Sequence, residues 1–346
     1  MSELLTRAID SLADRRDLSE TDAAEALAEI MAGEATDIEI AGFLIALRVK
    51  GETVEELAGL ARTMRAFAAF VPTAGEDLVD TAGTGGGRTT FNVSTTAALI
   101  AAAAGCTVAK HGSRSSTGLS GSADLLEALG AKIDLDAAGV GRCIGELGFG
   151  FMFAPYHHPA TRRVVEVRKQ LKVRTTFNFL GPLTNPAGAS RQLLGVSDPA
   201  MLPKMAGALA LLGTRHALLV SSEDSLDELS ISAPTRVIEV RDGLLEEYLV
   251  TPEELGLSRY PPDAVLGGNP AANAEIARRI FAGEQGASRD LAALNAGAAI
   301  YVGGRAETLV EGVQLAQAVI DAGLVTARLE AFVALTQELS VNGAGA

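Results

Sequence analysis

The sequence predicts an α/β protein with a small all-helical domain over residues 1–70 and a large α/β domain over residues 71–346, the latter built on a mostly parallel central sheet. Before Val71-Pro72 the apolar residues recur only at helical spacing. After it, short β-branched runs alternate with helical patterns, and this alternation is typical of parallel sheets. The 346 residues suit one large or two medium domains, and with only 4% aromatic residues the core is expected to be aliphatic.

Capping patterns mark three helices in the N-terminal part. Ser19 stands three residues before Asp22, and Thr36 and Thr53 each stand three residues before a glutamate. A hydroxyl followed by an acid at this spacing satisfies free backbone N–H groups in the first helical turn. Glycines 33 and 51 are expected to end two of these helices.

The α/β part alternates as follows. Strands are expected at 77–81, 106–111, 131–135, 149–155, 191–197 and 216–222, and a further β-branched run covers 235–250. Helices are expected from about 94 to 104, at 122–129, 137–147 and 200–212, and in the segments 274–283, 289–304 and 306–323. No internal repeat interrupts this order.

Charge and cysteine content restrict the class of protein. The net charge of −14 disfavours nucleic acid as a partner. Between Arg162 and Arg174, however, six basic residues face one acid, which indicates a small anionic ligand. Cys106 and Cys143 follow no metal spacing and are expected in the core. No signal peptide and no apolar run long enough to span a membrane is visible, so a cytoplasmic location is expected.

A glycine-rich turn in "DTAGTGGGRTTFNVST" is the first candidate site. The pattern predicts a strand, a turn over Gly83–Gly87 and a helix that begins near Asn92. Bare backbone N–H groups and a helix N-terminus together bind phosphate, and Asn92, Ser94 and Thr95 could cap the helix or contact phosphate oxygens or a metal. An ordinary tight turn remains the alternative. The spacing matches neither a P-loop nor a Rossmann turn.

Two further motifs end at predicted strands. Lys110 and His111 close one strand and precede a glycine- and hydroxyl-rich loop that reaches Ser122, which indicates a second phosphate site. The strand "HALLVSS" runs into four carboxylates, among them Asp227 and Glu228. A solvated acidic loop is one interpretation. The other is a Mg²⁺ site, because magnesium accepts one or two carboxylates together with substrate oxygens.

Taken together, these motifs resemble the anthranilate phosphoribosyltransferases nearly end to end. The most specific stretches are "SGSADLLEALG" and "FNFLGPLTNPA", joined by "KHGSRS", "FAPYHHPA" and "SLDELS". The sequence departs from the family at two places. The family's turn reads G-T-G-G-D-G-x-x-T-F-N, whereas this turn is one residue shorter and lacks the aspartate. Ser113 replaces the family's asparagine.

The resemblance implies a nucleoside phosphorylase/phosphoribosyltransferase type of fold, with a helical excursion at about 160–190 that returns to the N-terminal domain. It implies transfer of the phosphoribosyl group of phosphoribosyl pyrophosphate (PRPP) to the amine of anthranilate in tryptophan biosynthesis, with Mg²⁺, by a homodimer joined through the helical domain. The implied PRPP contacts are Gly83, Thr84, Gly86, Gly87, Thr90, Asn92, Ser94, Thr95, Lys110 and Ser122; those to anthranilate are Gly83, His111, Ser113 and Arg168; those to the metal are Ser94, Asp227 and Glu228.

Two alternatives stay open at this point. A pyrimidine nucleoside phosphorylase-type transferase would share the fold, use free phosphate and need no Asp227–Glu228 pair. A non-catalytic or nucleic-acid-binding paralogue would keep the fold alone. The lost turn aspartate and Ser113 favour the paralogue, and the net charge disfavours it.

Overall fold

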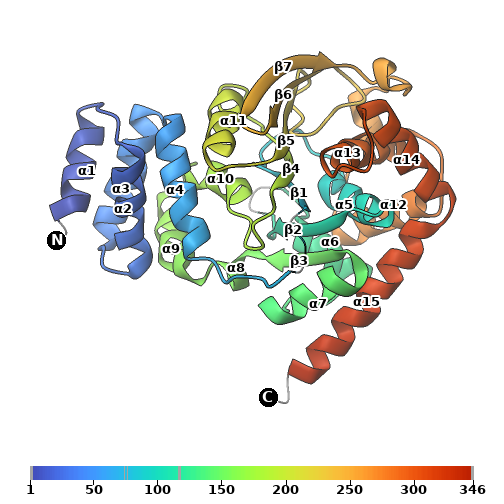
Figure 1. Cartoon of the computed structure of the whole chain (residues 1–346), viewed down its shortest axis with the longest axis horizontal. Helices are drawn as coiled ribbons and strands as arrows, with labels where there is room; N and C mark the ends of the chain where they lie inside the picture. Colours follow the sequence, from blue (N-terminus) through green and yellow to red (C-terminus); the bar gives the residue numbers. More distant parts are fainter. Residues whose placement is uncertain (1–2, 74, 76, 116–117, 344–346) are drawn as a thin grey trace.

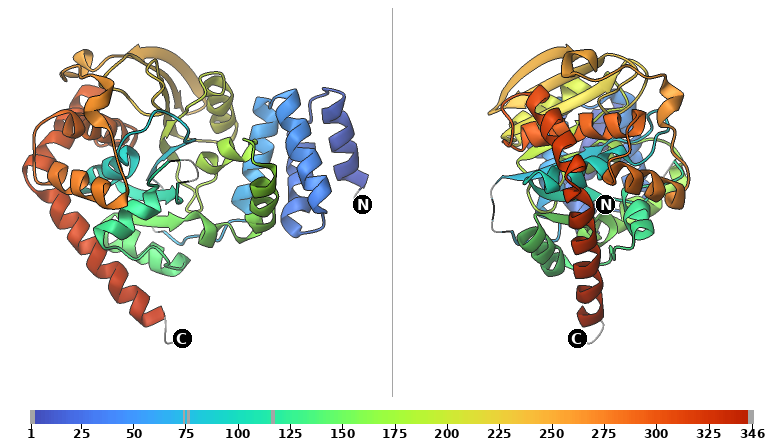
Figure 2. Two further views of the ribbon diagram at one scale, coloured as in Figure 1. Left: turned by 180° about the vertical axis from the view of Figure 1, so that it is seen from behind. Right: turned by 90° about the vertical axis from the view of Figure 1, so that its right-hand side faces the viewer.

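The computed structural model describes residues 3–73, 75, 77–115 and 118–343. Figure 1 shows the N-terminal helices at one end, the sheet in the middle and the C-terminal helices at the other end. The last helix, α15 (Leu324–Gly343), projects away from the body, as both views in Figure 2 show. The predicted combination of a helical part and a larger α/β part with a mostly parallel sheet is confirmed.

The N-terminal part consists of four helices whose caps follow the sequence. They are α1 (Glu3–Ala13), α2 (Glu20–Ala32), α3 (Asp37–Lys50) and α4 (Val54–Ala66). Ser19 accepts a hydrogen bond from the Asp22 N–H, and Thr36 and Thr53 form full capping boxes. Gly33 and Gly51 end α2 and α3, so these predictions are confirmed.

Seven strands form one sheet in the order β3-β2-β1-β4-β5-β6-β7. Their bounds are β1 Leu78–Gly83, β2 Thr107–Gly112, β3 Phe149–Phe153, β4 Arg191–Gly195, β5 His216–Ser222, β6 Thr235–Arg241 and β7 Leu244–Val250. The first five are parallel, and β6 and β7 add an antiparallel hairpin. All five parallel strands therefore end at one edge of the sheet, where open α/β sheets bind ligands.

The remaining helices connect and cover these strands. They are α5 Val93–Ala103, α6 Ser122–Leu129, α7 Ala137–Leu147, α8 Ala154–His157, α9 Arg162–Leu171, α10 Phe177–Leu180, α11 Leu202–Leu211, α12 Pro270–Phe281, α13 Ala287–Val302 and α14 Leu309–Asp321. In Figure 1, α11 lies between the sheet and α4, whereas α5 and α13 lie on the opposite side.

Alternate residues of the central strands point into two different cores. Leu193 of β4 and Leu218 of β5 belong to the core that contains α5 and α13. Leu194 and Leu219, one position later, belong to the core that contains α11 and the N-terminal helices. Because strand side chains alternate between the two faces, the sheet is buried on both sides and the helical part packs on one of them.

The segment after β3 also packs on the N-terminal helices. Helix α9 contacts α3, and Val164 and Val167 of α9 lie in the same core as α1–α4. These contacts fit the expected excursion, although the division into domains stays a prediction.

One predicted strand is wrong. Residues 131–135 alternate between buried and exposed side chains, yet they form no strand. The Lys132 N–H donates to Thr336 Oγ1 of α15 instead of to a neighbouring strand. The alternation therefore reflects burial of Ala131, Ile133 and Leu135 in the core, because the period of the side chains alone does not specify a strand partner for the backbone.

Both cysteines are buried and free, as expected for core residues. Burial raises the pKa of Cys106 to about 11 and that of Cys143 to about 12, so neither thiol is a nucleophile at neutral pH. No helix within the described residues combines the length and apolar character that crossing a bilayer requires.

Candidate active site

The glycine turn follows β1 at the edge where the parallel strands end. Gly85 and Gly86 have φ of +64° and +89°, a region that side chains disfavour. A Cβ atom added to Gly87 would lie 2.4 Å from Asp227 Oδ1, and one added to Gly83 would lie 3.2 Å from Asp227 Oδ2. A side chain at Gly87 would therefore collide with Asp227, and the absence of side chains lets the backbone of the turn lie directly against this residue.

Arg88 fastens the shortened turn to the loop after β5. Its backbone N–H donates to the Ser225 carbonyl (2.8 Å), and its Nη2 atom donates to Asp224 Oδ2 (2.8 Å). Asp224 in turn accepts hydrogen bonds from the hydroxyls of Ser222 and Ser230. Turn and loop are thus held together by a largely buried ion pair, in a chain that lacks the expected aspartate.

The far side of the turn is held by hydroxyls and by Arg174, to which the sequence alone assigned no individual role. The Thr84 N–H donates to the carbonyl of Gly195 (2.9 Å), and Thr84 Oγ1 accepts from the Ser197 N–H (3.0 Å). Arg174 Nη2 donates to the Gly85 carbonyl (3.2 Å) and to Ser197 Oγ (3.3 Å). Arg174 is the last residue of the basic stretch, but nothing in that stretch distinguishes it from its neighbours.

Asp227 and Glu228 form a carboxylate pair beside the turn. Burial raises the pKa of both groups, and together with the charge of Asp227 it raises the pKa of Glu228 to about 8. The charge of Asp227 disfavours ionisation of Glu228, and a divalent cation bound by both would relieve this repulsion. Among the described residues no group of three His, Cys, Asp or Glu side chains could hold a metal alone, so a cation here would need substrate oxygens as well.

Lys110 of β2 lies within reach of the Glu228 charge and is 1% exposed. Its Nζ atom donates to the carbonyl of Thr81, to Thr81 Oγ1 (3.2 Å) and to Ser94 Oγ (3.4 Å). Burial lowers the pKa of Lys110, and the charges of Asp80 and Glu228 oppose that shift. The buried ammonium group therefore lies between the carboxylate pair and the first residues of α5.

Helix α5 begins at the turn, but Asn92 does not cap it as expected. Its amide instead donates to the Ser120 carbonyl (3.0 Å) and accepts from Asn273 (2.8 Å), which ties the turn to the loop before α6.

The first residues of α5 are only partly engaged. Ser94 donates its backbone N–H to Glu228, and Thr95 Oγ1 is buried with no hydrogen-bond partner among the described residues. The start of α5 thus keeps donors available. Thr90, by contrast, donates its hydroxyl to the Phe91 carbonyl (3.0 Å).

Ser122 and Ser113 lie on the loop beyond β2. Ser122 begins α6, and its Cβ lies 3.1 Å from where a Cβ on Gly112 would stand. The carbonyl of Ser113 accepts from the Ala123 N–H (3.3 Å). Both residues are therefore placed beside the end of β2, next to His111.

His111 belongs to a buried cluster of histidines. Its ring centroid is 5.0 Å from that of His158, and its Nε2 atom has no partner within the described chain. Burial lowers the pKa of His111 well below the usual value and that of His158 to about 4, so both rings are neutral at physiological pH. A neutral ring with a free nitrogen can meet an uncharged amine or an aromatic ring.

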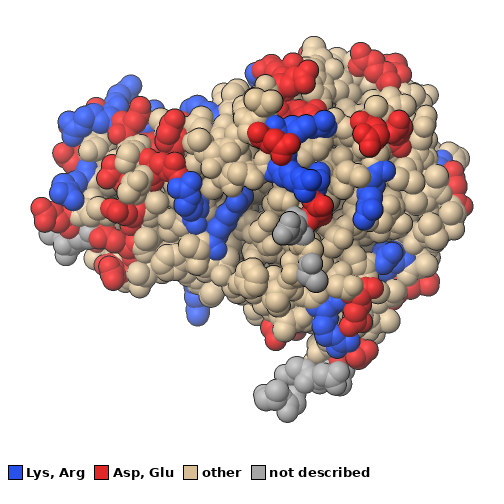
Figure 3. All heavy atoms as spheres, viewed as in Figure 1, with Lys and Arg blue, Asp and Glu red and all other residues tan. Residues whose placement is uncertain are grey.

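Arg168 lies apart from these groups, on α9. Its Nη2 atom donates to Asn178 Oδ1 (3.1 Å), its guanidinium carbon is 5.7 Å from the centre of the Phe177 ring, and its Nε atom is buried without a partner in the described residues. Figure 3 shows further basic side chains over the junction between the N-terminal helices and the sheet. The predicted residues thus fall into two groups: one around the glycine turn, and Arg168 on the helical side.

Asn185 is a further structural residue of this region. In "GPLTNPA", expected to form a rigid wall, its amide donates to Asp80 Oδ2 (2.8 Å) and to the Ala109 carbonyl (2.8 Å). Asp80 also accepts from the His111 N–H (3.0 Å). This buried network holds the ends of β1 and β2 together.

Comparison with known proteins identifies the family of this chain. The family model described as "Glycosyl transferase family, a/b domain" matches residues 75–326, and the one described as "Glycosyl transferase family, helical bundle domain" matches residues 6–68. The anthranilate phosphoribosyltransferase of Rubrobacter xylanophilus is 51% identical over 343 residues, which cover 99% of this chain and 100% of the relative.

Solved structures give the same result. The crystal structure of the Thermus thermophilus enzyme has a TM-score of 0.91 at 46% identity, covering 95% of this chain and 99% of that one. The Saccharomyces cerevisiae enzyme in complex with PRPP and Mg has a TM-score of 0.87 at 27% identity, covering 97% and 99%. The same yeast enzyme was also solved with 4-fluoroanthranilate. Similarity of this extent, in sequence and in fold, means that the chain belongs to the anthranilate phosphoribosyltransferase family.

Proposed function

We propose that this protein transfers the phosphoribosyl group of PRPP to the amine of anthranilate, releasing pyrophosphate, as a step of tryptophan biosynthesis. The observation that supports this most strongly is the bare glycine turn packed directly on Asp227, with the buried Lys110 within reach of the Glu228 charge and hydrogen-bonded to Ser94. The backbone of such a turn and a buried cation can bind the oxygens of a diphosphate, and a carboxylate pair binds the metal that accompanies it.

The PRPP contacts are proposed on both sides of the turn. The backbone of Gly83, Gly86 and Gly87 and the first residues of α5 would receive the diphosphate, and Ser122 at the start of α6 would donate to the distant 5′-phosphate. Thr84 and Asn92 are engaged in protein hydrogen bonds, so we assign them to shaping the turn. Thr90 is also bonded internally and would contact PRPP through its backbone.

Mg²⁺ fits the site, and we propose Asp227, Glu228 and Ser94 as its protein ligands. The supporting observation is geometric: both carboxylate oxygens of Asp227 face the glycine turn, and the neighbouring Glu228 lies within reach of the Asp227 charge. When bound, Mg²⁺ neutralises charge that builds on the departing diphosphate.

Anthranilate would bind between the turn and the helical side. Arg168 offers a planar fork for its carboxylate, with an Nε atom that has no partner in the described residues. His111, Ser113 and Gly83 would line the opposite wall. The amine nitrogen then forms a bond to the anomeric carbon as the bond from that carbon to the diphosphate oxygen breaks, and the nitrogen loses its proton to water. Positioning and charge neutralisation suffice for this reaction, and no side-chain nucleophile is needed.

We also propose a homodimer joined through the helical part, located in the cytoplasm. Ile38 and Val49 of α3 are 85% and 66% exposed, and exposed apolar side chains on one helix favour a partner surface. The cytoplasmic location rests on the sequence expectation alone.

An assay of anthranilate fluorescence tests the function. Purified protein with PRPP and Mg²⁺ is expected to consume anthranilate. Activity only with a pyrimidine nucleoside and phosphate would instead select the phosphorylase-type alternative, and activity with neither would favour the non-catalytic paralogue.

A further inference from the structure

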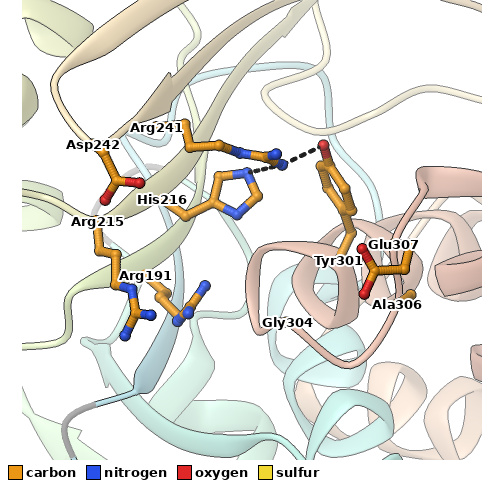
Figure 4. Close-up of a pocket in the computed structure, with 9 residues that line it drawn as sticks. All are labelled: Arg191, Arg215, His216, Arg241, Asp242, Tyr301, Gly304, Ala306 and Glu307. Carbon is orange, nitrogen blue, oxygen red and sulfur yellow. Dashed lines mark hydrogen bonds between the residues drawn. The ribbon is translucent and has the colours of Figure 1, made fainter.

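A second pocket lies at the opposite edge of the sheet, where β4 and β5 begin (Figure 4). Its volume is about 230 Å³. It is lined by Arg191, Arg215, His216, Arg241, Asp242, Tyr301, Gly304, Ala306 and Glu307. The glycine turn lies at the other end of the same strands, so the proposed reaction does not use this pocket.

Two arginines of the pocket share one carboxylate oxygen. Arg191 Nε and Arg215 Nη1 lie 3.0 Å and 2.6 Å from the same atom, Asp77 Oδ1. Arg191 is fixed further by donating from Nη1 to the Val302 carbonyl (2.6 Å). The hydrogen bond from Arg191 lowers the pKa of Asp77, and the positive charges of Arg191, Arg215 and Arg305 lower it further. One negative charge therefore faces three positive ones.

The positive excess is confined to the Arg191–Arg215 end of the pocket, because the acids elsewhere in and beside it offset the remaining charge. Glu239 neutralises Arg241 (2.9 Å) and accepts a hydrogen bond from Tyr301 (3.0 Å). Asp242 and Glu307 are acidic and exposed at the rim. In Figure 4 the guanidinium groups of Arg191 and Arg215 lie next to each other at one end, and Glu307 lies at the other end beside Tyr301.

We infer that this pocket binds a small tetrahedral oxyanion of the phosphate class, with the free guanidinium N–H groups of Arg191 and Arg215 as its donors. Arginine forks match the geometry of such an anion, and an anion placed there compensates the charge that Asp77 leaves unbalanced. The half-exposed Arg215 is accessible to an anion from solvent, whereas the buried Arg191 is held in a fixed position.

Calorimetric titration with inorganic phosphate at constant ionic strength tests the inference. Wild-type protein is expected to bind phosphate in the millimolar range or tighter. Arg215→Ala should weaken binding about tenfold or more, and Arg215→Lys, which keeps the charge but not the fork, should weaken it less. Glu307→Gln should tighten binding, because it removes a repulsive charge at the rim.

Two controls locate the anion. Arg236→Ala removes a surface arginine that pairs with Glu247 elsewhere on the sheet, and it should leave phosphate affinity unchanged. Gly87→Ala blocks the glycine turn and should also leave this binding in place. No binding by folded wild-type protein, equal affinity in Arg215→Ala, or loss of binding only in Gly87→Ala would each overturn the inference.

Discussion

The two halves of the proposed active site are built differently. The diphosphate side is made of backbone and buried side chains at the end of the sheet, and Arg88, Asn92 and Lys110 connect each segment of it to a neighbour. The anthranilate side depends on Arg168, which stands on α9 and donates a side-chain hydrogen bond to Asn178. The first half is fixed by the fold, whereas the second depends on where the helical segment lies. Substitutions in one half should therefore change the kinetic constants for one substrate and leave those for the other nearly unchanged.

The largest effect is expected for Gly87→Ala. An added Cβ would lie 2.4 Å from Asp227 Oδ1 and 2.9 Å from the Asp227 backbone nitrogen, so turn and loop must separate. A displacement of this kind lowers kcat/KM for PRPP about a hundredfold or more. Gly145→Ala, on α7 with open space around it, is the matched control and should leave activity unchanged. Near-normal PRPP kinetics in Gly87→Ala would show that the close contact is unimportant.

Arg168→Ala is expected to change the KM values of the two substrates to different extents. Loss of the fork should raise KM for anthranilate about thirtyfold and change KM for PRPP little. The neighbouring exposed Lys169, which pairs with Glu166, serves as control through Lys169→Ala. Equal increases in both KM values would remove Arg168 from the anthranilate side.

A smaller effect is expected at the ion pair that fastens the turn. Arg88→Ala and Asp224→Asn should each raise KM for PRPP about tenfold, and the double variant should add little, with a coupling of about 1–2 kcal/mol. The exposed pair Arg236–Glu247, treated in the same way, should show no coupling. Additive effects of Arg88→Ala and Asp224→Asn would mean that the pair does not act as a unit.

At the buried histidines of the anthranilate side, the effect to be measured is on the pH dependence of stability. Because the folded pKa of His158 is about 4 against 6.5 in the unfolded chain, the unfolded state binds more protons between these values. Stability contributed by the neutral ring is therefore present above pH 6.5 and is lost as the pH falls toward 4. In His158→Asn, the free energy of unfolding should depend less steeply on pH in this window, by up to about 1.4 kcal/mol per pH unit. Denaturant titrations at several pH values measure this dependence. If the free energy of unfolding of His158→Asn changed with pH as steeply as that of the wild type, the prediction would be contradicted.

Local sequence patterns predicted most of the fold. Capping residues such as Thr36 located helix starts, and glycines such as Gly33 located helix ends, because both signals act within one turn of the chain. Residues 131–135 were predicted wrongly because their alternating burial in the core needs no strand partner, and the Lys132 N–H donates to Thr336 of α15, far away in the sequence.

The candidate site was predictable where a motif is continuous in the sequence. The glycine turn and the Asp227–Glu228 pair were both found, yet the ion pair between Arg88 and Asp224 joins residues 136 positions apart and has no local signal. The same holds for Arg174, whose contacts with Gly85 and Ser197 exist only after folding. Asn92 resembles a helix cap in sequence, but its side-chain oxygen accepts hydrogen bonds from Ser120 and Asn273 instead.

The most direct test of the diphosphate site is calorimetric titration of PRPP in the presence of Mg²⁺ and, separately, of a chelator. We expect binding that depends on Mg²⁺ and that Asp227→Asn weakens strongly, while Arg168→Ala leaves it nearly unchanged. Binding of equal strength without the metal, or no binding at all by folded wild-type protein, would contradict the assignment of the glycine turn and the carboxylate pair to the diphosphate.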